Sequence, residues 1–405
     1  MDRALREAFN AAYTPEFYQR YQDRLAERFG MRVPFRLAET PFFVPPALRD
    51  RLARNAREIV AKISDPALIE RMKIAVPSEL DVPRCDALAN CIQVDFAIVR
   101  DENGELDGKL VELQGFPSLY AFTLIQAQFL DEMLREMPGF GGTHLTPLFG
   151  HTPAQYVEKL RHAIVAGNDP REVILMDLDP PSQKTSPDFE ATKQLLGVDA
   201  VCPTTLEREG RRLFRRLDGK RVQVKRIYNR VVFDELIKKG IELPFSYIED
   251  LDVTWMPHPN WYWTWSKYTV PFVDHPSVPR ARFLSEVTEV PDDLERYVLK
   301  PLFSFAGSGV KVDVTRADID AIPHGERAGW ILQEKITYAP DIITPTGVKV
   351  KAEVRMMFLR APDQETPELV INLARLARGK MLGVDQNRDL DWVGGSVGMF
   401  PAYVG

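Results

Sequence analysis

The alternation of hydrophobic and polar positions predicts helices in the first part of the chain and a β-hairpin directly after them. Residues 14–30 open on a threonine and close on a glycine, as helices often do, and residues 46–63 repeat apolar positions at helical spacing. Residues 91–100 and 108–116 resemble strands, and the turn-forming sequence DENGELD between them predicts an exposed turn. Residues 119–134 predict the next helix.

Helical and strand patterns alternate between residues 151 and 245, which favours an open α/β sheet. A passage rich in Pro and Trp, residues 255–268, then separates this part from a β-rich C-terminal third. We expect the four tryptophans between Trp255 and Trp265 to pack at a domain interface, with stacking on a substrate as the alternative. The main domain break is therefore predicted at about residues 245 to 265.

The composition indicates a globular protein with more than one packed subdomain. The chain has 405 residues, of which 45% are hydrophobic and 27% charged, and we find no apolar run long enough to predict a membrane span. A net charge of -6 argues against nucleic acid as a partner. Three cysteines without C-x-x-C spacing, and an N-terminus without the apolar segment of a signal peptide, predict a cytoplasmic protein.

The second strand of the hairpin carries an acid and an amide where alternation would place apolar side chains. In the sequence LVELQGFPSLY, residues 110–120, Glu112 and Gln114 lie two positions apart and so share one face of the strand. The first strand carries Asp95. A solvated face of an edge strand is the ordinary explanation for such residues, and a binding site is the alternative.

A lysine at a strand end is followed by a loop of small residues in the sequence YVLKPLFSFAGSGVKV. Lys300 supplies one fixed positive charge, and the loop with Gly307, Ser308 and Gly309 supplies backbone N–H groups, which together suit a polyphosphate. The chain contains neither a P-loop nor a G-x-G-x-x-G motif. A β-hairpin with a glycine turn would explain the stretch equally well.

Two further strands of the C-terminal third carry polar residues. The sequence GWILQEKITYAP is an apolar strand running into Gln333, Glu334 and Lys335, and a strand that becomes a linker can hold an adenine ring between backbone groups. In KAEVRMMFL, Glu353 and Arg355 share one strand face. Taken separately, a strand end and a solvated strand face are the ordinary explanations.

The order of these elements resembles the nucleotide site of the ATP-grasp superfamily. Lys267, Lys300 with its glycine loop, the LQEKI strand and the Glu353-x-Arg355 strand follow one another as they do in that family. The resemblance implies that the lysines contact the phosphates and that Arg355 faces the transferred phosphate. It implies nucleotide contacts from Lys267, Lys300, Gly307, Ser308, Gly309, Gln333, Glu334, Lys335 and Ile336, and catalytic roles for Arg355, Lys300 and Arg378.

ATP-grasp chains usually finish with a metal-binding E-x-N strand, whereas this chain has no carboxylate after Asp391. The front hairpin supplies one instead, since it is similar to the metal hairpin of glutathionylspermidine synthetase. The resemblance therefore implies a circularly permuted ATP-grasp protein that binds Mg²⁺ through Asp95, Glu112 and Gln114, because Mg²⁺ takes hard oxygen ligands.

Two residues depart from that family. Gln114 stands where the family has Asn, and Gln93 stands where it has a catalytic arginine, a role that Arg84 or another residue would have to take. Arg375 and Arg378 are candidates to brace phosphates or an acyl phosphate, or are exposed strand charges. Asn387 and the pair Gly394 and Gly395 are candidates to shape a substrate loop.

The resemblance implies an α+β fold with four parts. These are an N-terminal helical segment (1–80), a metal-binding hairpin and helix (81–150), a Rossmann-like α/β segment that precedes the ATP-grasp region (151–250), and the nucleotide-binding region (251–405). The implied activity is ATP- and Mg²⁺-dependent joining of a small-molecule carboxylate to an amine through an acyl phosphate. A phosphotransferase on the same fold, or a non-catalytic ATP-binding regulatory protein, remains an alternative, and neither the substrates nor the oligomeric state is predicted.

Overall fold

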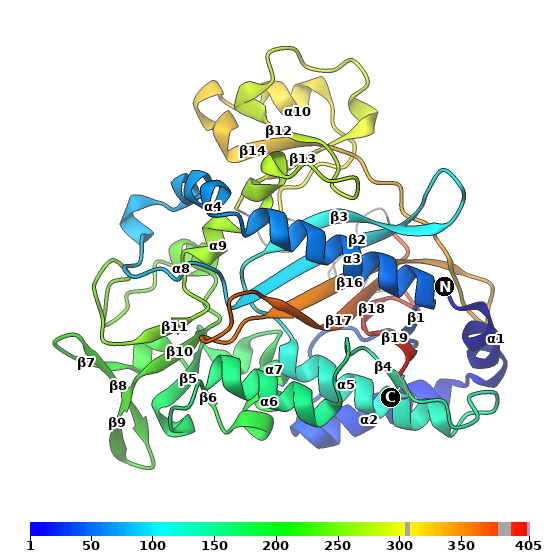
Figure 1. Ribbon diagram of the computed structural model, residues 1–405, viewed down its shortest axis with the longest axis horizontal. Helices are drawn as coiled ribbons and strands as arrows, with labels where there is room; N and C mark the ends of the chain where they lie inside the picture. Colours follow the sequence, from blue (N-terminus) through cyan, green and yellow to red (C-terminus); the bar gives the residue numbers. More distant parts are fainter. Residues whose placement is uncertain (304–307, 380–389, 403–405) are drawn as a thin grey trace.

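The computed structural model describes residues 1–303, 308–379 and 390–402, and it shows a mixed α and β fold with several sheets (Figure 1). A long antiparallel sheet runs through the middle of the molecule. Helices lie below this sheet in the view of Figure 1, and a small sheet lies above it. In the described ranges, no helix is long and apolar enough to cross a membrane.

The central sheet joins segments from both ends of the chain. Its path is β18-β17-β16-β2-β3, all antiparallel, with the short β15 also paired to β16. The strands are β2 (Cys91–Arg100), β3 (Leu106–Gln114), β15 (Ile342–Ile343), β16 (Lys349–Leu359), β17 (Glu368–Ala377) and β18 (Gly394–Ser396). The predicted hairpin and its exposed turn are thus confirmed, and β2 lies inside the sheet beside β16.

Side chains alternate across the central sheet. On β2, Ile92, Val94 and Phe96 point to one face, which packs against α3, the predicted helix at residues 46–63. The opposite face is apolar at one end and polar farther along the strands. Cys91 on β2 and Met357 on β16 pack there in the same apolar cluster as residues of α5 and α6, whereas Gln93, Asp95 and Arg355 follow on the same face.

The helices cover the faces of the sheets. They are α1 (Arg3–Ala12), α2 (Pro15–Phe29), α3 (Pro46–Ile63), α4 (Pro66–Met72), α5 (Tyr120–Arg135), α6 (Pro153–Ile164), α7 (Ser186–Leu196), α8 (Phe233–Lys239), α9 (Trp261–Thr264) and α10 (Arg316–Asp320). Gly30 ends α2 in the left-handed conformation, as its sequence predicts. Thr14 stands before α2, but its side chain makes no capping hydrogen bond.

A parallel sheet with the order β11-β10-β5-β6 lies at the lower left of Figure 1. Its strands are β5 (Val173–Met176), β6 (Asp199–Val201), β10 (Arg226–Asn229) and β11 (Thr254–Met256). Helix α7 connects β5 to β6, as expected for parallel neighbours, which need a crossover connection. A meander of β7 (Glu207–Glu209), β8 (Arg212–Leu217) and β9 (Lys220–Val224) projects from it.

The small antiparallel sheet at the top of Figure 1 has the order β12-β14-β13. Its strands are β12 (Ala281–Phe283), β13 (Tyr297–Pro301) and β14 (Trp330–Glu334). Lys300 pairs with Ile331, and Gln333 pairs with Val298 two positions along, so all four side chains share one face of this sheet.

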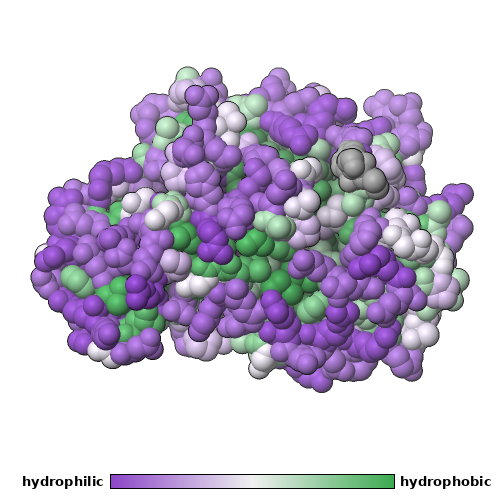
Figure 2. All heavy atoms as spheres, turned by 60° about the horizontal axis from the view of Figure 1, so that its bottom comes forward, coloured by the Kyte–Doolittle hydropathy of each residue, from purple (hydrophilic) through white to green (hydrophobic). Residues whose placement is uncertain are grey.

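A three-stranded sheet closes the molecule near its C-terminal end. It comprises β1 (Phe42–Phe43), β19 (Gly398–Pro401) and β4 (Leu145–Thr146), so the end of the described chain packs on early segments. Figure 2 shows a largely hydrophilic surface on the face that carries the lower helices of Figure 1, with apolar side chains gathered toward the middle.

Candidate functional site

Seven charged side chains meet between the central sheet and the small sheet, and we call them the ionic cluster. Cross-strand pairing places five of them on one face of the central sheet, because directly opposed residues point to the same side. Arg355 on β16 lies opposite Asp95 on β2, and Asp95 lies opposite Glu112 on β3. The cluster comprises Asp95, Glu112, Lys267, Lys300, Glu353, Arg355 and Arg375.

Asp95 lies at the centre of the ionic cluster and is fully buried. Arg355 donates to it through two parallel bonds, from Nε to Oδ1 and from Nη2 to Oδ2, each 2.6 Å long. Arg375 donates from Nη2 to both Asp95 and Glu353, and the Tyr338 hydroxyl donates to Glu353 Oε2 at 3.2 Å. Such charge-assisted and bidentate bonds are the strong ones in proteins, so these four charges hold one another in place.

Two lysines reach the same face from outside the central sheet. Lys300, on β13 of the small sheet, donates from Nζ to the carbonyl oxygen of Val111 at 3.1 Å. Lys267 Nζ lies 3.3 Å from Glu112 Oε1, and the Gln114 amide donates to Glu112 Oε2 at 3.0 Å. The structure therefore joins the front hairpin to the C-terminal third across 189 residues of sequence.

A close backbone approach holds Lys267 beside the hairpin. Gly115 donates its N–H to the Trp265 carbonyl at 2.7 Å, and a Cβ at Gly115 would lie 2.6 Å from the Trp261 carbonyl oxygen. No side chain fits at such a distance, so glycine is required here. Trp261 and Trp265 are both buried, as the packing interpretation of these tryptophans predicts. Lys267 follows Trp265 by two residues, so this contact sets its position as well.

The surroundings shift the pKa values of the cluster. Burial lowers the pKa of Lys300 to about 8, with Lys267 nearby acting in the same direction and Glu112 against it. Burial opposes ionisation of Glu112, but Lys267 and Arg355 hold its pKa below the usual value. Burial raises the pKa of Glu353 in spite of Arg375. Glu112 is therefore charged at neutral pH, and Lys300 remains largely protonated there.

The hairpin offers ligands that suit a magnesium ion. Asp95 and Glu112 are cross-strand neighbours, and Gln114 lies beside Glu112, so two carboxylates and one amide gather on one face. Mg²⁺ takes few protein oxygens and keeps waters and phosphates as its other ligands, so this donor set fits it. Within the described ranges, no three His, Cys, Asp or Glu side chains form a metal-binding group by themselves.

The residues expected to hold the nucleotide base lie on and after β14. Gln333 is 1% exposed, and nothing in the described part of the chain hydrogen bonds its side-chain amide. The Glu334 carboxylate accepts the Arg280 N–H at 3.1 Å. Lys335 pairs with Asp313 at 3.2 Å, and Ile336 is half-buried past the strand end. Gln333 shares its sheet face with Lys300.

Several other predicted residues are exposed or lie outside the described part of the chain. Ser308 and Gly309 are exposed, and Gly307 and Asn387 lie outside the described residues. Arg378 is exposed one residue past the end of β17, whereas Arg375, three positions earlier, takes part in the ionic cluster. Of these two arginines, the structure thus brings Arg375 to the carboxylates.

Gln93 and Arg84 have clear partners elsewhere. The Gln93 amide donates to the Ser118 carbonyl at 3.0 Å, at the Pro-Ser turn after the hairpin. Arg84 is 56% exposed and pairs with Asp250 at 2.7 Å, so it does not replace the arginine that the resemblance leads one to expect at Gln93. Tyr338 is a member of the site that sequence reasoning missed, because no local pattern marks a tyrosine in a linker as the partner of Glu353.

Another buried carboxylate, that of Asp188, holds the segment that follows the hairpin, and the sequence did not predict it. Asp188, at the start of α7, accepts the N–H groups of Leu119, Ala121 and Phe122 at the start of α5. Arg230 also donates to it, at 2.9 Å. Asp188 thus caps α5 from another element and holds the turn that follows Gln114.

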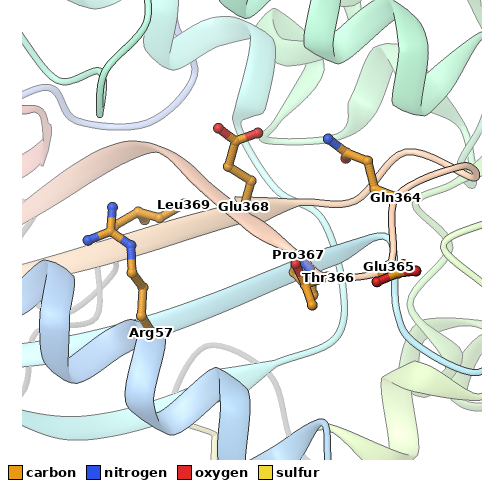
Figure 3. Close-up of a pocket in the computed structure, with 7 residues that line it drawn as sticks. All are labelled: Arg57, Gln364, Glu365, Thr366, Pro367, Glu368 and Leu369. Atoms are coloured by element: carbon orange, nitrogen blue, oxygen red, sulfur yellow. The ribbon is translucent and has the colours of Figure 1, made fainter.

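The surface also has a recess at the turn between β16 and β17, with a volume of about 460 Å³. Residues 364–369 and Arg57 of α3 line it (Figure 3). Figure 3 shows Arg57 beside Leu369, while Glu368 and Gln364 point away from Arg57 on the other side of the loop. These side chains do not converge, so the ionic cluster is the better candidate for chemistry.

Comparisons with known proteins address the fold. No protein-family model matches the chain, and no curated protein matches its sequence. A solved structure of a glutathione synthetase-like effector from Globodera pallida, in its apo form, is similar with a TM-score of 0.59 at 12% sequence identity. The match covers 96% of this chain and 99% of that chain. The fold is thus similar, over nearly its whole length, to that of a glutathione synthetase-like protein.

Proposed function

We propose that the protein is an ATP- and Mg²⁺-dependent ligase of the ATP-grasp type that joins a carboxylate to an amine. The observation that carries the proposal is the meeting of Lys267 and Lys300 with Asp95, Glu112 and Arg355 in one ionic cluster. The two lysines and the arginine suit a polyphosphate, and the adjacent carboxylates suit the divalent cation that accompanies it.

The chain order supports a circularly permuted arrangement. The candidate metal ligands lie on β2 and β3 near the front of the chain, and the candidate phosphate ligands lie after residue 260. Pairing of β2 with β16 brings them to one face despite that separation. The likeness to a glutathione synthetase-like effector supports the same fold family, and the closer relation to glutathionylspermidine synthetase rests on the hairpin sequence.

In the proposed reaction the substrate carboxylate displaces the γ-phosphoryl group of ATP and forms an acyl phosphate and ADP. The amine then attacks the acyl carbon, and phosphate leaves. Lys300 and Arg355 offset the charge that spreads over the transferred phosphoryl group. Asp95, Glu112 and Gln114 would hold Mg²⁺, which supplies Lewis acidity at the phosphates.

Interception of the activated carboxyl tests the proposal. The protein is incubated with MgATP, hydroxylamine and a pooled set of small carboxylic acids, and the products are identified by mass spectrometry. The proposal predicts an acyl hydroxamate together with equal ADP. A stable phosphate ester formed without any amine would instead identify a phosphotransferase, and ATP binding without turnover in every pool would identify a regulatory protein.

A further inference from the structure

Each carboxylate of the ionic cluster is neutralised by basic side chains of the chain itself. The pairs are Asp95 with Arg355 and Arg375, Glu353 with Arg375, and Glu112 with Lys267. The same carboxylates are the groups suited to a divalent cation, and the same basic groups are those suited to a polyphosphate. In the free protein, therefore, the groups suited to the cation and the groups suited to the polyphosphate are paired with one another.

We propose that polyphosphate and divalent cation enter this site by ion exchange. Arg355 and Arg375 leave Asp95 and Glu353 for the phosphoryl oxygens, and the divalent cation takes the place of the arginines at the carboxylates. This inference rests on the proposed function and concerns how its site is loaded. It makes Arg375 a ligand-binding residue.

Burial explains why the two ligands depend on each other. Asp95 is 0% exposed, so a polyphosphate that drew both Arg355 and Arg375 away without a cation would leave a buried carboxylate unpaired. A cation arriving alone would meet Arg355 and Arg375, which already hold both oxygens of Asp95. Each ligand removes the obstacle to the other, which is positive coupling between two binding events.

Arg375 is the cation best placed to begin the exchange. Its side chain is 28% exposed, against 8% for Arg355. Its Nε is buried and makes no hydrogen bond within the described part of the chain, although its Nη2 contacts two carboxylates. A buried donor without an acceptor is costly, and a phosphoryl or carboxylate oxygen supplies the missing partner.

The test uses tripolyphosphate, which carries the phosphate chemistry without a base, in titration calorimetry with EDTA or with Mg²⁺. For the unaltered protein, Mg²⁺ should strengthen binding by at least about tenfold. Asp95→Asn should strengthen binding of metal-free tripolyphosphate by about tenfold, because Arg355 loses its carboxylate partner and Arg375 loses one of its two, and it should abolish the effect of Mg²⁺. Gain of affinity on removal of a charge from the site is not expected of a merely structural residue.

Two further variants complete the experiment. Glu353→Gln removes one of the two carboxylates that Arg375 contacts and leaves the Asp95 pair with Arg355 intact, so it should give a smaller gain in affinity. It also tests the exchange if Asp95→Asn does not fold. Glu368→Gln breaks an ion pair with Lys159 near the β16 to β17 turn and should change nothing.

The outcomes separate the inference from the function. If MgATP binds but neither Asp95→Asn nor Glu353→Gln gains affinity for metal-free tripolyphosphate, the exchange is wrong and the ligase proposal stands. If tripolyphosphate and MgATP bind to none of these proteins, with or without Mg²⁺, the proposed function fails and the inference fails with it.

Discussion

Arg355 and Asp95 lie 260 residues apart in sequence and form a bidentate ion pair, with both N to O distances at 2.6 Å. The pair joins the front hairpin to the strand that carries Glu353, and both side chains are buried. It therefore adds a side-chain contact to the pairing of β2 with β16 that joins the two distant parts of the candidate site.

Removal of the arginine should destabilise the fold. Arg355→Met leaves the buried Asp95 with Arg375 as its remaining basic partner, and we expect the free energy of unfolding to fall by about 3 kcal/mol. Urea denaturation followed by circular dichroism measures this change. The double variant Asp95→Asn with Arg355→Met should recover part of the loss, because the buried carboxylate that has lost Arg355 is then gone.

The matched control is the exposed ion pair between Arg171 and Asp169. Arg171→Met should leave stability unchanged within error, since exposed pairs contribute little. Equal stability of Arg355→Met and the unaltered protein would show that the buried pair does not hold the two parts together.

Glu112→Gln should separate chemistry from nucleotide binding. We expect turnover in the hydroxamate assay to fall by about a hundredfold, because the variant weakens a metal ligand where charge develops in the transition state. Nucleotide affinity should survive in part, since the proposed contacts to the base come from β14 and the residues after it. Glu207→Gln, on the projecting meander, is the control and should turn over normally. Full activity of Glu112→Gln would show that Glu112 is not a metal ligand.

Nucleotide affinity should depend on pH through Lys300. Burial lowers its pKa to about 8, so the lysine is charged below that pH and loses its charge above it. Affinity for MgATP should therefore be constant near pH 7 and fall by up to tenfold per unit above about pH 8. Calorimetry at pH 7, 8 and 9 measures this fall.

An arginine at the same position provides the comparison. Lys300→Arg keeps its charge throughout this range, so its affinity should stay level to pH 9. The same fall in both proteins would assign the titration to a group other than Lys300.

Gly115→Ala tests how the hairpin is docked. The added Cβ would lie 2.6 Å from the Trp261 carbonyl oxygen, so the backbone near Gln114 must shift. We expect a loss of about 1 to 3 kcal/mol in stability and weaker MgATP binding. At Gly325 a Cβ meets nothing within 4 Å, so Gly325→Ala should behave as the unaltered protein. Equal behaviour of the two variants would contradict the close approach.

Local patterns in the sequence were sufficient to predict several elements. The hairpin of β2 and β3 follows from alternation and from DENGELD, and α3 follows from its helical period. The oddly polar face of β3, the last strand of the central sheet, pointed to Glu112 and Gln114. These are short-range properties, which a sequence displays directly.

The remaining features of the site depend on tertiary contacts, which local sequence patterns do not show. The Lys267 pair with Glu112 depends on the close approach of Gly115 to Trp261, which no spacing reveals. Asp188 caps α5 from a helix 67 residues away from Ala121, so it carries no local capping pattern. Arg375 and Arg378 look alike in sequence, and strand register alone places the first opposite Glu353.

We propose that the ionic cluster binds MgATP. Calorimetric titration of MgATP into two single variants measures this binding. Lys300→Met removes the buried charge on the small sheet, whereas Lys311→Met removes an exposed lysine that pairs with Asp318. The account predicts one site in the unaltered protein and in Lys311→Met, and at least about tenfold weaker binding in Lys300→Met. Absence of binding at millimolar MgATP in the folded protein, or equal affinity in both variants, would contradict it.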